Sequence, residues 1–352
     1  MAIAGWLRRP IVWAPISAAL LVLVAWRSRL WETGDRLEIA DPTALAAALL
    51  LSAAVPVLWA IRSAGLLAAA GDRVPAAALI PMTAFANTIN NLTPASTGEL
   101  LRIWLLRAHF GVPYSVGAAV VGIERLGAFG YLAGSAALAW LASWAGAPPV
   151  AVLLALAVLV VAPAVLYAAG GRPSALVARL PFQGLLGATR WSRATSWLRR
   201  VDELVALLLT HPVRLLRFAV LTFAVLACYT IQLLLVARSL GVVLDPIATW
   251  GALGLAITAG VLSLLPFGLG SADLVLIGLL GALGVQPTTA TAIAFGYRLV
   301  STLPLGLAGV ASYAWLSARL PVGGLGEAAA QVAGGLESDD DPAQAPATSI
   351  PR

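Results

Sequence analysis

Long apolar stretches separated by short polar ones dominate the pattern of this 352-residue sequence. A helix rises about 1.5 Å per residue, so roughly 20 apolar residues cross a hydrocarbon core of about 30 Å. Stretches of this kind lie at residues 11–30, 42–61, 114–143, 148–170, 213–239 and 287–318. The pattern therefore predicts an all-α integral membrane protein, a polytopic helical bundle with about six full spans.

Two further apolar regions are each broken near a proline. The first consists of segments 75–93 and 95–110, and the second of segments 246–265 and 267–283. The second segment of each region is too short to cross the core, and lipid cannot satisfy the polar groups of a broken backbone. We therefore expect two re-entrant helical hairpins whose broken parts line protein or a cavity.

The two broken regions share a spacing of proline, glycine, Gly-Val and arginine. The intervals are 4, 13 and 14 residues in the first region and 4, 14 and 14 in the second. The positions are Pro94, Gly98, Gly111 and Arg125, and then Pro266, Gly270, Gly284 and Arg298. We interpret them as an inverted repeat, with one copy at about 42–143 and the other at about 213–318. Transporters use such repeats to expose one central site alternately to each side of the membrane.

Composition and charge fix the environment of the chain. Hydrophobic residues make up 60% of the sequence and charged residues 11%, which excludes an ordinary soluble domain. The net charge of +6 lies largely between apolar spans, so it does not indicate a nucleic-acid partner. The arginine-rich loop 171–212 is expected in the cytoplasm. That orientation gives a membrane domain at 1–320 in the cell membrane, with both termini and a disordered tail at 321–352 in the cytoplasm.

Few groups are available for cofactor chemistry. The single cysteine, Cys228, excludes a disulfide within the chain, and two histidines make a metal site of Cys/His type unexpected. We expect no cofactor and no catalytic site.

Six charged residues fall where the membrane interior is expected, and each costs about 2.5–3.5 kcal/mol on insertion scales. They are Glu99, Arg102, Glu124, Arg125, Asp273 and Arg298. Arginine suits bidentate contact with phosphate, and Gly268 and Gly270 would let the backbone approach such a ligand. The same three acids and three arginines could instead neutralise one another and fix helix packing. Both interpretations stay open at this level.

The motifs resemble a known family. Their order and spacing are similar to those in the flippase-like membrane region of lysylphosphatidylglycerol synthases and of stand-alone proteins that share it. The motifs that carry the resemblance are Asn91 to Pro94, Gly98-Glu99, Arg102, Gly111-Val112, Glu124-Arg125-Leu126, Leu265-Pro266, Gly268-Leu269-Gly270, Asp273 and Arg298. The resemblance covers roughly residues 10–318. It implies movement of an anionic or aminoacylated phospholipid between leaflets, and it does not extend to the aminoacyl-transferring domain.

The resemblance also implies the substrate-binding residues, which are Asn91, Pro94, Gly98, Glu99, Arg102, Glu124, Arg125, Pro266, Gly268, Gly270, Asp273 and Arg298. The chain departs from the family pattern at Ser96, Ala128, Phe267 and Asp273. A basic and an acidic position of the family are thereby lost, so the substrate is expected to differ from the family's best-known lipid.

Two other functions fit the sequence. One is an accessory or scaffold subunit that works with a separately encoded lipid-modifying enzyme of an envelope pathway. The other is a membrane-embedded transferase acting on a lipid phosphate, with Glu99 or Asp273 as general base. The sequence contains no nucleotide motif and no metal-ligand cluster that would favour the transferase.

Overall fold

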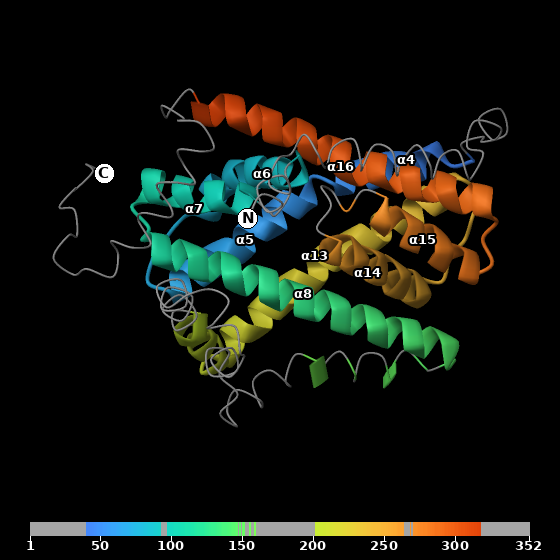
Figure 1. Ribbon diagram of the computed structural model, residues 1–352, viewed down its shortest axis with the longest axis horizontal. Helices are drawn as coiled ribbons and strands as arrows, with labels where there is room; N and C mark the ends of the chain where they lie inside the picture. The colour runs from blue at the N-terminus through green and yellow to red at the C-terminus, as the bar shows by residue number, and fades with distance from the viewer. Residues whose placement is uncertain are drawn as a thin grey trace, which may run out of the picture.

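The computed structural model describes residues 40–92, 97–146, 201–263 and 270–317, with single residues between 148 and 159 and at 268. The regular secondary structure assigned there is all helix (Figure 1). The predicted span 11–30, nearly all of the span 148–170, residues 171–200 of the arginine-rich loop and the tail lie outside the described residues.

Four segments within these ranges are long and apolar enough to cross a membrane. They are α4 (Pro42–Leu51) with α5 (Ala54–Ala69), α8 (Tyr114–Trp144), α13 (Pro212–Ser239) and α16 (Pro287–Ser317). Proline in the first turn helps to start α4, α13 and α16, because its missing N–H has no partner in that position anyway. Asp41 completes the start of α4, since its carboxylate accepts a hydrogen bond from the Ala44 N–H at 3.0 Å.

The first of these segments runs further than the sequence indicated. The predicted span ended at residue 61, before Arg62, but α5 continues to Ala69. A break at Ser52 and Ala53 separates α4 from α5. The Ser52 hydroxyl donates to the carbonyl of Val300 at 2.7 Å and accepts from Gln232 Nε2 at 2.7 Å, which ties the break to α16 and α13.

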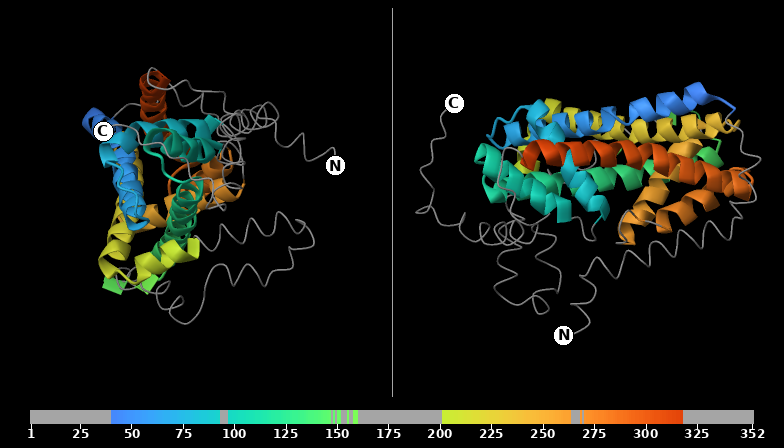
Figure 2. Two further views of the ribbon diagram at one scale, coloured as in Figure 1. Left: turned by 90° about the vertical axis from the view of Figure 1, so that its left-hand side faces the viewer. Right: turned by 90° about the horizontal axis from the view of Figure 1, so that it is seen from above.

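Two pairs of shorter helices match the two broken regions. The first pair is α6 (Ala76–Leu92) with α7 (Thr97–Phe110), and the second is α14 (Pro246–Leu262) with α15 (Ser271–Ala282). The helices of each pair pack against each other. Figure 1 and the right-hand view of Figure 2 place the two pairs at opposite ends of the long axis of the molecule. Re-entry of each pair on one side of a bilayer stays a prediction.

Each pair is followed by one long helix, and these two helices extend along the long axis of the molecule. Helix α8 starts beside α7 and α16 starts beside α15, and the colour gradients of Figure 1 show that these two long helices run in opposite directions. Each is 31 residues long. The turns that lead into them contain Gly111 (φ 68°) and Gly284 (φ 87°), whose left-handed backbone favours glycine. Two equivalent glycines of the sequence repeat therefore have the same local role.

The C-terminal end of the predicted arginine-rich loop is helical. Residues 201–209 form a helix, and Val201, Leu204 and Leu208 are buried in a core with side chains of α5, α6, α7 and α8. These three positions share one helix face because they are three and four residues apart. This part of the segment is thus packed, where a solvated loop was expected.

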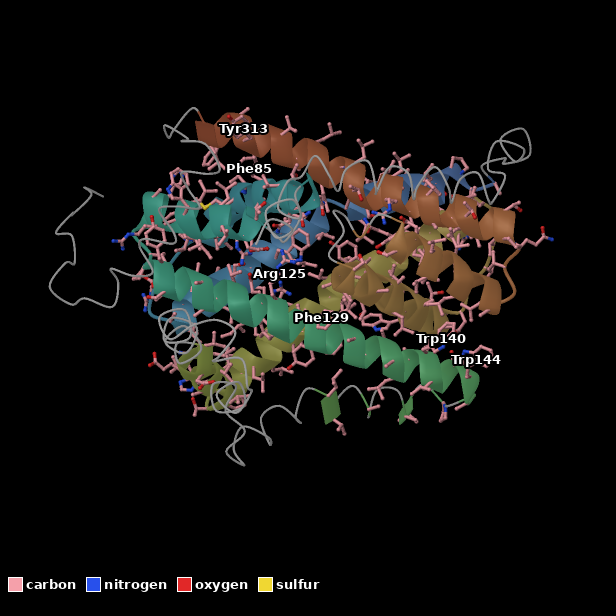
Figure 3. The ribbon with its side chains drawn as sticks, viewed as in Figure 1. Phe85, Arg125, Phe129, Trp140, Trp144 and Tyr313 are labelled. Carbon is pink, nitrogen blue, oxygen red and sulfur yellow. The ribbon has the colours of Figure 1, made fainter. Side chains whose placement is uncertain are left out.

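A second core lies among α4, α13, α14, α15 and α16. Helix α14 joins it to α8 through very close packing. A Cβ on Gly251 would lie 2.7 Å from the Trp140 nitrogen, and one on Gly254 would lie 2.4 Å from the Ala136 Cβ. Small residues allow this approach of two backbones, as is common between membrane helices. Figure 3 shows Trp140 and Trp144 towards the far end of α8, well away from Arg125 in its middle.

Candidate functional site

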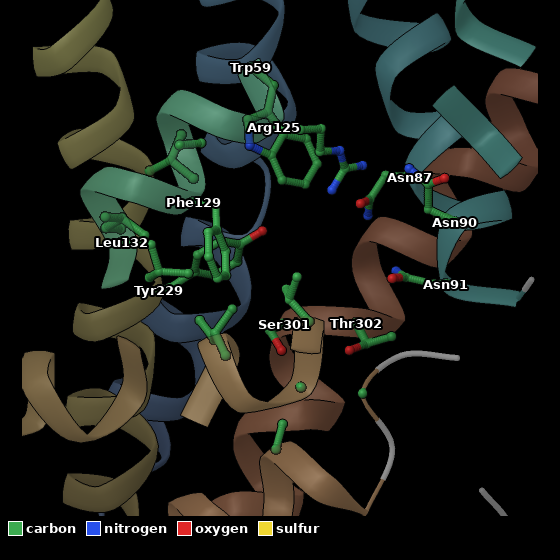
Figure 4. A pocket seen from close by; sticks show the side chains of 18 of the residues that line it. Trp59, Asn87, Asn90, Asn91, Arg125, Phe129, Leu132, Tyr229, Ser301 and Thr302 are labelled. Atoms are coloured by element: carbon green, nitrogen blue, oxygen red, sulfur yellow. The ribbon is translucent and has the colours of Figure 1, made fainter. Parts of the chain in front are cut away.

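A cavity of about 680 Å³ lies between the two helix pairs. It is lined from α6 and α7 of the first pair, from α14 and α15 of the second, and from α5, α8, α13 and α16. Figure 4 shows side chains of several of these helices directed into one space. The charged lining residues are Arg62, Glu99, Arg102, Glu124, Arg125, Asp273 and Arg298. The six intramembrane charges predicted from the sequence therefore meet at one place.

Glu124 is the centre of a buried ion network. Its carboxylate accepts a hydrogen bond from Arg102 and another from the Ser63 hydroxyl at 2.6 Å, and its Oε1 lies 3.6 Å from Arg62 Nε. Arg62 also donates to the Thr222 hydroxyl at 3.3 Å. Arg62, Arg102 and Glu124 are all buried. Because a buried charge is costly when unpaired, this network holds α5, α7, α8 and α13 together.

Glu99 forms the second carboxylate of this network. Arg102 Nε lies 3.2 Å from Glu99 Oε2, which confirms the pair expected from their spacing on one helix. Glu99 Oε1 accepts from Arg125 and from Asn90 Nδ2, the latter at 3.0 Å. Arg102 thus bridges both acids, whereas Arg125 pairs with Glu99 alone among the described residues.

A separate ion pair joins the second helix pair to α16. Arg298 donates to Asp273 through Nε to Oδ1 at 2.7 Å and through Nη2 to Oδ2 at 2.8 Å. Asp273 Oδ2 also accepts from the Gly270 N–H at 3.0 Å, so Asp273 caps the start of its own helix. The backbone N–H expected to meet a phosphate at Gly270 is therefore already engaged.

The cavity lining carries an excess of positive charge. Four arginines and three acids give a formal balance of +1 among the described lining residues. Arg125 is the most exposed of the arginines, with 51% of its side chain accessible, against 20% for Arg298 and 9% for Arg62 and Arg102. Among the four described lining arginines, Arg125 therefore has the guanidinium most accessible to an anion.

The remaining predicted residues fall into three groups. Asn91 and Gly268 line the cavity. Gly98 and Gly270 are buried, and a Cβ on Gly98 would lie 1.9 Å from the carbonyl oxygen of Ala86, so Gly98 serves the packing of α7 on α6. Pro94 and Pro266 lie outside the described residues.

Two features of the cavity were missed in the sequence. Arg62, which follows the predicted span 42–61 and was not among the predicted site residues, is buried in the network. Asn87 and Asn90 also line the cavity beside Asn91. The signal was present, because spacings of three and four residues place all three carboxamides on one face of α6. Among the described residues no cluster of His, Cys, Asp and Glu could hold a metal ion.

The sequence matches one family model over residues 11–309, and that model describes the lysylphosphatidylglycerol synthase TM region. No match was found among curated proteins. The matched range includes all of the helices described above except the end of α16. Together with the four long apolar helices, it identifies an integral membrane protein. The chain belongs to the family of the lysylphosphatidylglycerol synthase TM region.

Proposed function

We propose that this protein moves a polar-headed phospholipid, anionic or aminoacylated, between the two leaflets, with the central cavity as the headgroup site. The observation that carries the proposal is the meeting of both helix pairs at one cavity with excess arginine charge. Arginine is well suited to phosphate, because its planar fork of N–H donors matches two phosphate oxygens.

The arrangement of the helix pairs supports transport. The pairs lie at opposite ends of the molecule, and residues of both line the cavity. In transporters built from inverted repeats, broken helices form a site near the bilayer midplane, and movement of one repeat against the other exposes it to each side in turn. We therefore assign the pairs the role of the two re-entrant hairpins in a protein of about six spans.

The state of the carboxylates favours transport over catalysis. A general base needs a carboxylate that is free to take a proton. Glu99 and Asp273, the two acids considered for that role, are each bound by arginine, and Glu99 has two such partners. We accordingly propose that the protein is not an enzyme.

We place the protein in the cell membrane with both termini in the cytoplasm, following the distribution of arginine along the sequence. A separately encoded enzyme that modifies the lipid is the proposed source of the headgroup.

Reconstituted vesicles test the proposal directly. Wild-type protein should transfer fluorescent phosphatidylglycerol between leaflets, as measured by quenching of the outer leaflet. Arg125→Ala should slow transfer about ten- to hundredfold, since a hydrogen bond to a charged group contributes about 1.5–3 kcal/mol. Arg238→Ala is the matched control, because Arg238 is 70% exposed and pairs with Asp41 at the helix end, away from the cavity. Folded wild type that transfers no anionic or aminoacylated phospholipid would refute the proposal and favour an accessory role.

A further inference from the structure

Each described acidic group of the cavity is already paired with arginine, so none of them is available to pair with a positively charged ligand. Glu124 binds Arg102, Arg62 and Ser63. Glu99 binds Arg102, Arg125 and Asn90. Asp273 accepts two hydrogen bonds from Arg298 and one from the Gly270 N–H. An ammonium group in the cavity would thus meet carboxylates that already have arginine partners, in surroundings with a balance of +1 among the described residues. Like charges so placed oppose its entry.

Neutral hydrogen-bonding groups are available instead. The carboxamides of Asn87 and Asn91 line the cavity and make no side-chain hydrogen bond to another described residue. Thr302 of α16 contributes a hydroxyl to the same space, and Ser301 borders it with a hydroxyl that already donates to the Arg298 carbonyl at 3.5 Å (Figure 4). Carboxamides and hydroxyls can both donate and accept, which is what a ligand hydroxyl requires.

Arg125 and these groups border the same space. In Figure 4 the guanidinium of Arg125 points from α8 towards Asn87, with Asn91 further along α6 and Ser301 and Thr302 beyond. Aromatic rings of Trp59, Phe129 and Tyr229 lie on the side of Arg125 away from the asparagines. A headgroup held at its phosphate by Arg125 would therefore extend along a wall of carboxamides and hydroxyls.

The cavity thus offers an accessible arginine and uncharged polar groups, while its acids are paired. From this we infer that the headgroup carried by this protein is a phosphodiester-linked polyol without a positive charge. The inference rests on the proposed function and narrows it, since it selects the anionic headgroups and excludes the aminoacylated ones. Arg125 binds the phosphate, while Asn87, Asn91 and the Thr302 hydroxyl bind hydroxyl groups of the polyol. Hydrogen-bonding sites of this kind discriminate strongly against analogues that lack the matching group, because buried polar atoms are then left unpaired.

Four fluorescent lipids with the same acyl chains test the inference in vesicles that contain the wild-type protein. Phosphatidylinositol supplies phosphate and hydroxyls, and phosphatidylethanol supplies phosphate alone. Phosphatidylethanolamine and lysylphosphatidylglycerol carry ammonium groups. We expect phosphatidylinositol to cross at least about tenfold faster than phosphatidylethanol, which corresponds to one lost hydrogen bond. The two ammonium lipids should be slowest.

The outcomes separate the inference from the proposed function. Equal rates for all four lipids, or the fastest rate for lysylphosphatidylglycerol, would overturn the inference and leave lipid transport standing. Transfer of none of them by folded protein would refute both. Binding of the same lipids to the purified protein, followed by native mass spectrometry, should give the same order.

A double variant locates the hydroxyl site. Asn87→Leu with Asn91→Leu keeps the number and branching of the side-chain heavy atoms and removes both carboxamides. The ratio of the phosphatidylinositol rate to the phosphatidylethanol rate should fall about tenfold, towards one. The thermal unfolding midpoint of the purified variant, compared with that of wild type, is the control for folding. A folded variant that keeps the wild-type ratio would contradict the assigned role of the two asparagines.

Discussion

Arg298 binds Asp273 through two parallel hydrogen bonds, from Nε to Oδ1 at 2.7 Å and from Nη2 to Oδ2 at 2.8 Å. Only 6% of the Asp273 side chain and 20% of the Arg298 side chain are accessible. Arg125, at the corresponding position in the spacing shared by the two broken regions, is 51% accessible and contacts Glu99 through Nη2. Both arginines line the cavity, but Arg298 also connects α16 to the start of α15, whereas Arg125 leaves more of its side chain accessible.

Loss of Asp273 should therefore weaken the fold. Asp273→Ala leaves Arg298 without its bidentate partner in a largely buried position, and breaking such a pair costs about 3–5 kcal/mol. The thermal unfolding midpoint of the purified protein in detergent should fall clearly. Asp41→Ala is the control, because the Asp41–Arg238 pair is solvent-accessible and its loss should change the midpoint little. Equal decreases for the two variants would contradict the assignment.

Gly98→Ala should separate α7 from α6. The new Cβ would lie 1.9 Å from the carbonyl oxygen of Ala86, which is backbone and cannot rotate away. Overpacking of this kind costs about 1–3 kcal/mol or more. Gly130→Ala in α8 is the matched control, since no heavy atom beyond the adjacent backbone of its own helix lies within 4 Å of the new Cβ. It should leave the unfolding midpoint unchanged or raise it, because alanine favours helix over glycine by about 1 kcal/mol. A Gly98→Ala protein as stable as Gly130→Ala would rule out the packing role.

Two variants test how the net charge of the cavity lining affects binding of an anionic lipid. Arg62→Met lowers the balance of the described lining residues from +1 to zero, and Arg62→Met with Glu124→Gln restores +1. The single variant should bind phosphatidylglycerol about tenfold more weakly, as expected for one charge at about 10 Å in an effective dielectric constant near 20. The double variant should recover most of this affinity. Dissociation constants from native mass spectrometry measure both, and an equally weak double variant would show that local geometry dominates over net charge.

Cysteine labelling tests access to the cavity. Cys228 is the single cysteine of the sequence, so Cys228→Ser gives a background without thiols. In that background, Asn87→Cys and Thr302→Cys should react with a membrane-impermeant thiol reagent, and phosphatidylglycerol should slow the reaction. Val310→Cys, on a side chain that is exposed on α16 outside the cavity, is the comparison and should be protected by lipid in vesicles. Labelling of neither cavity position from either side would exclude an accessible site.

Local signals in the sequence were sufficient to locate most helices. The breaks between α6 and α7 and between α14 and α15 follow from proline and glycine, which act on neighbouring residues. The predicted bounds of these four helices agree with the structure to within about four residues. The pair of Glu99 and Arg102 was also predictable, because a spacing of three residues defines a helix face.

Tertiary contacts were beyond the reach of the same reasoning. Arg125 and Glu99 are 26 residues apart, and Arg298 and Asp273 are 25 apart, so their pairing depends on how separate helices pack. Arg62 was absent from the predicted site for this reason, since its partner Glu124 belongs to another helix. Gly98 was assigned to the ligand because the contact that explains it, with Ala86 on α6, is visible only in three dimensions.

The odd number of charges in the cavity has an electrical consequence for the proposed transport. With a singly negative headgroup bound, the described lining residues and ligand together would be neutral, and without it they would carry +1. A membrane potential would then change the energy of the step in which the empty site returns across the membrane, but not that of the step in which the loaded site crosses. The change is about 2.3 kcal/mol per 100 mV for a charge that crosses the whole field. Net lipid transfer driven by an imposed potassium diffusion potential would reveal this voltage dependence. Transfer rates that do not change with voltage would show that the excess charge does not move across the membrane during transport. In such a lipid carrier, the membrane potential would act on the step in which the site is empty.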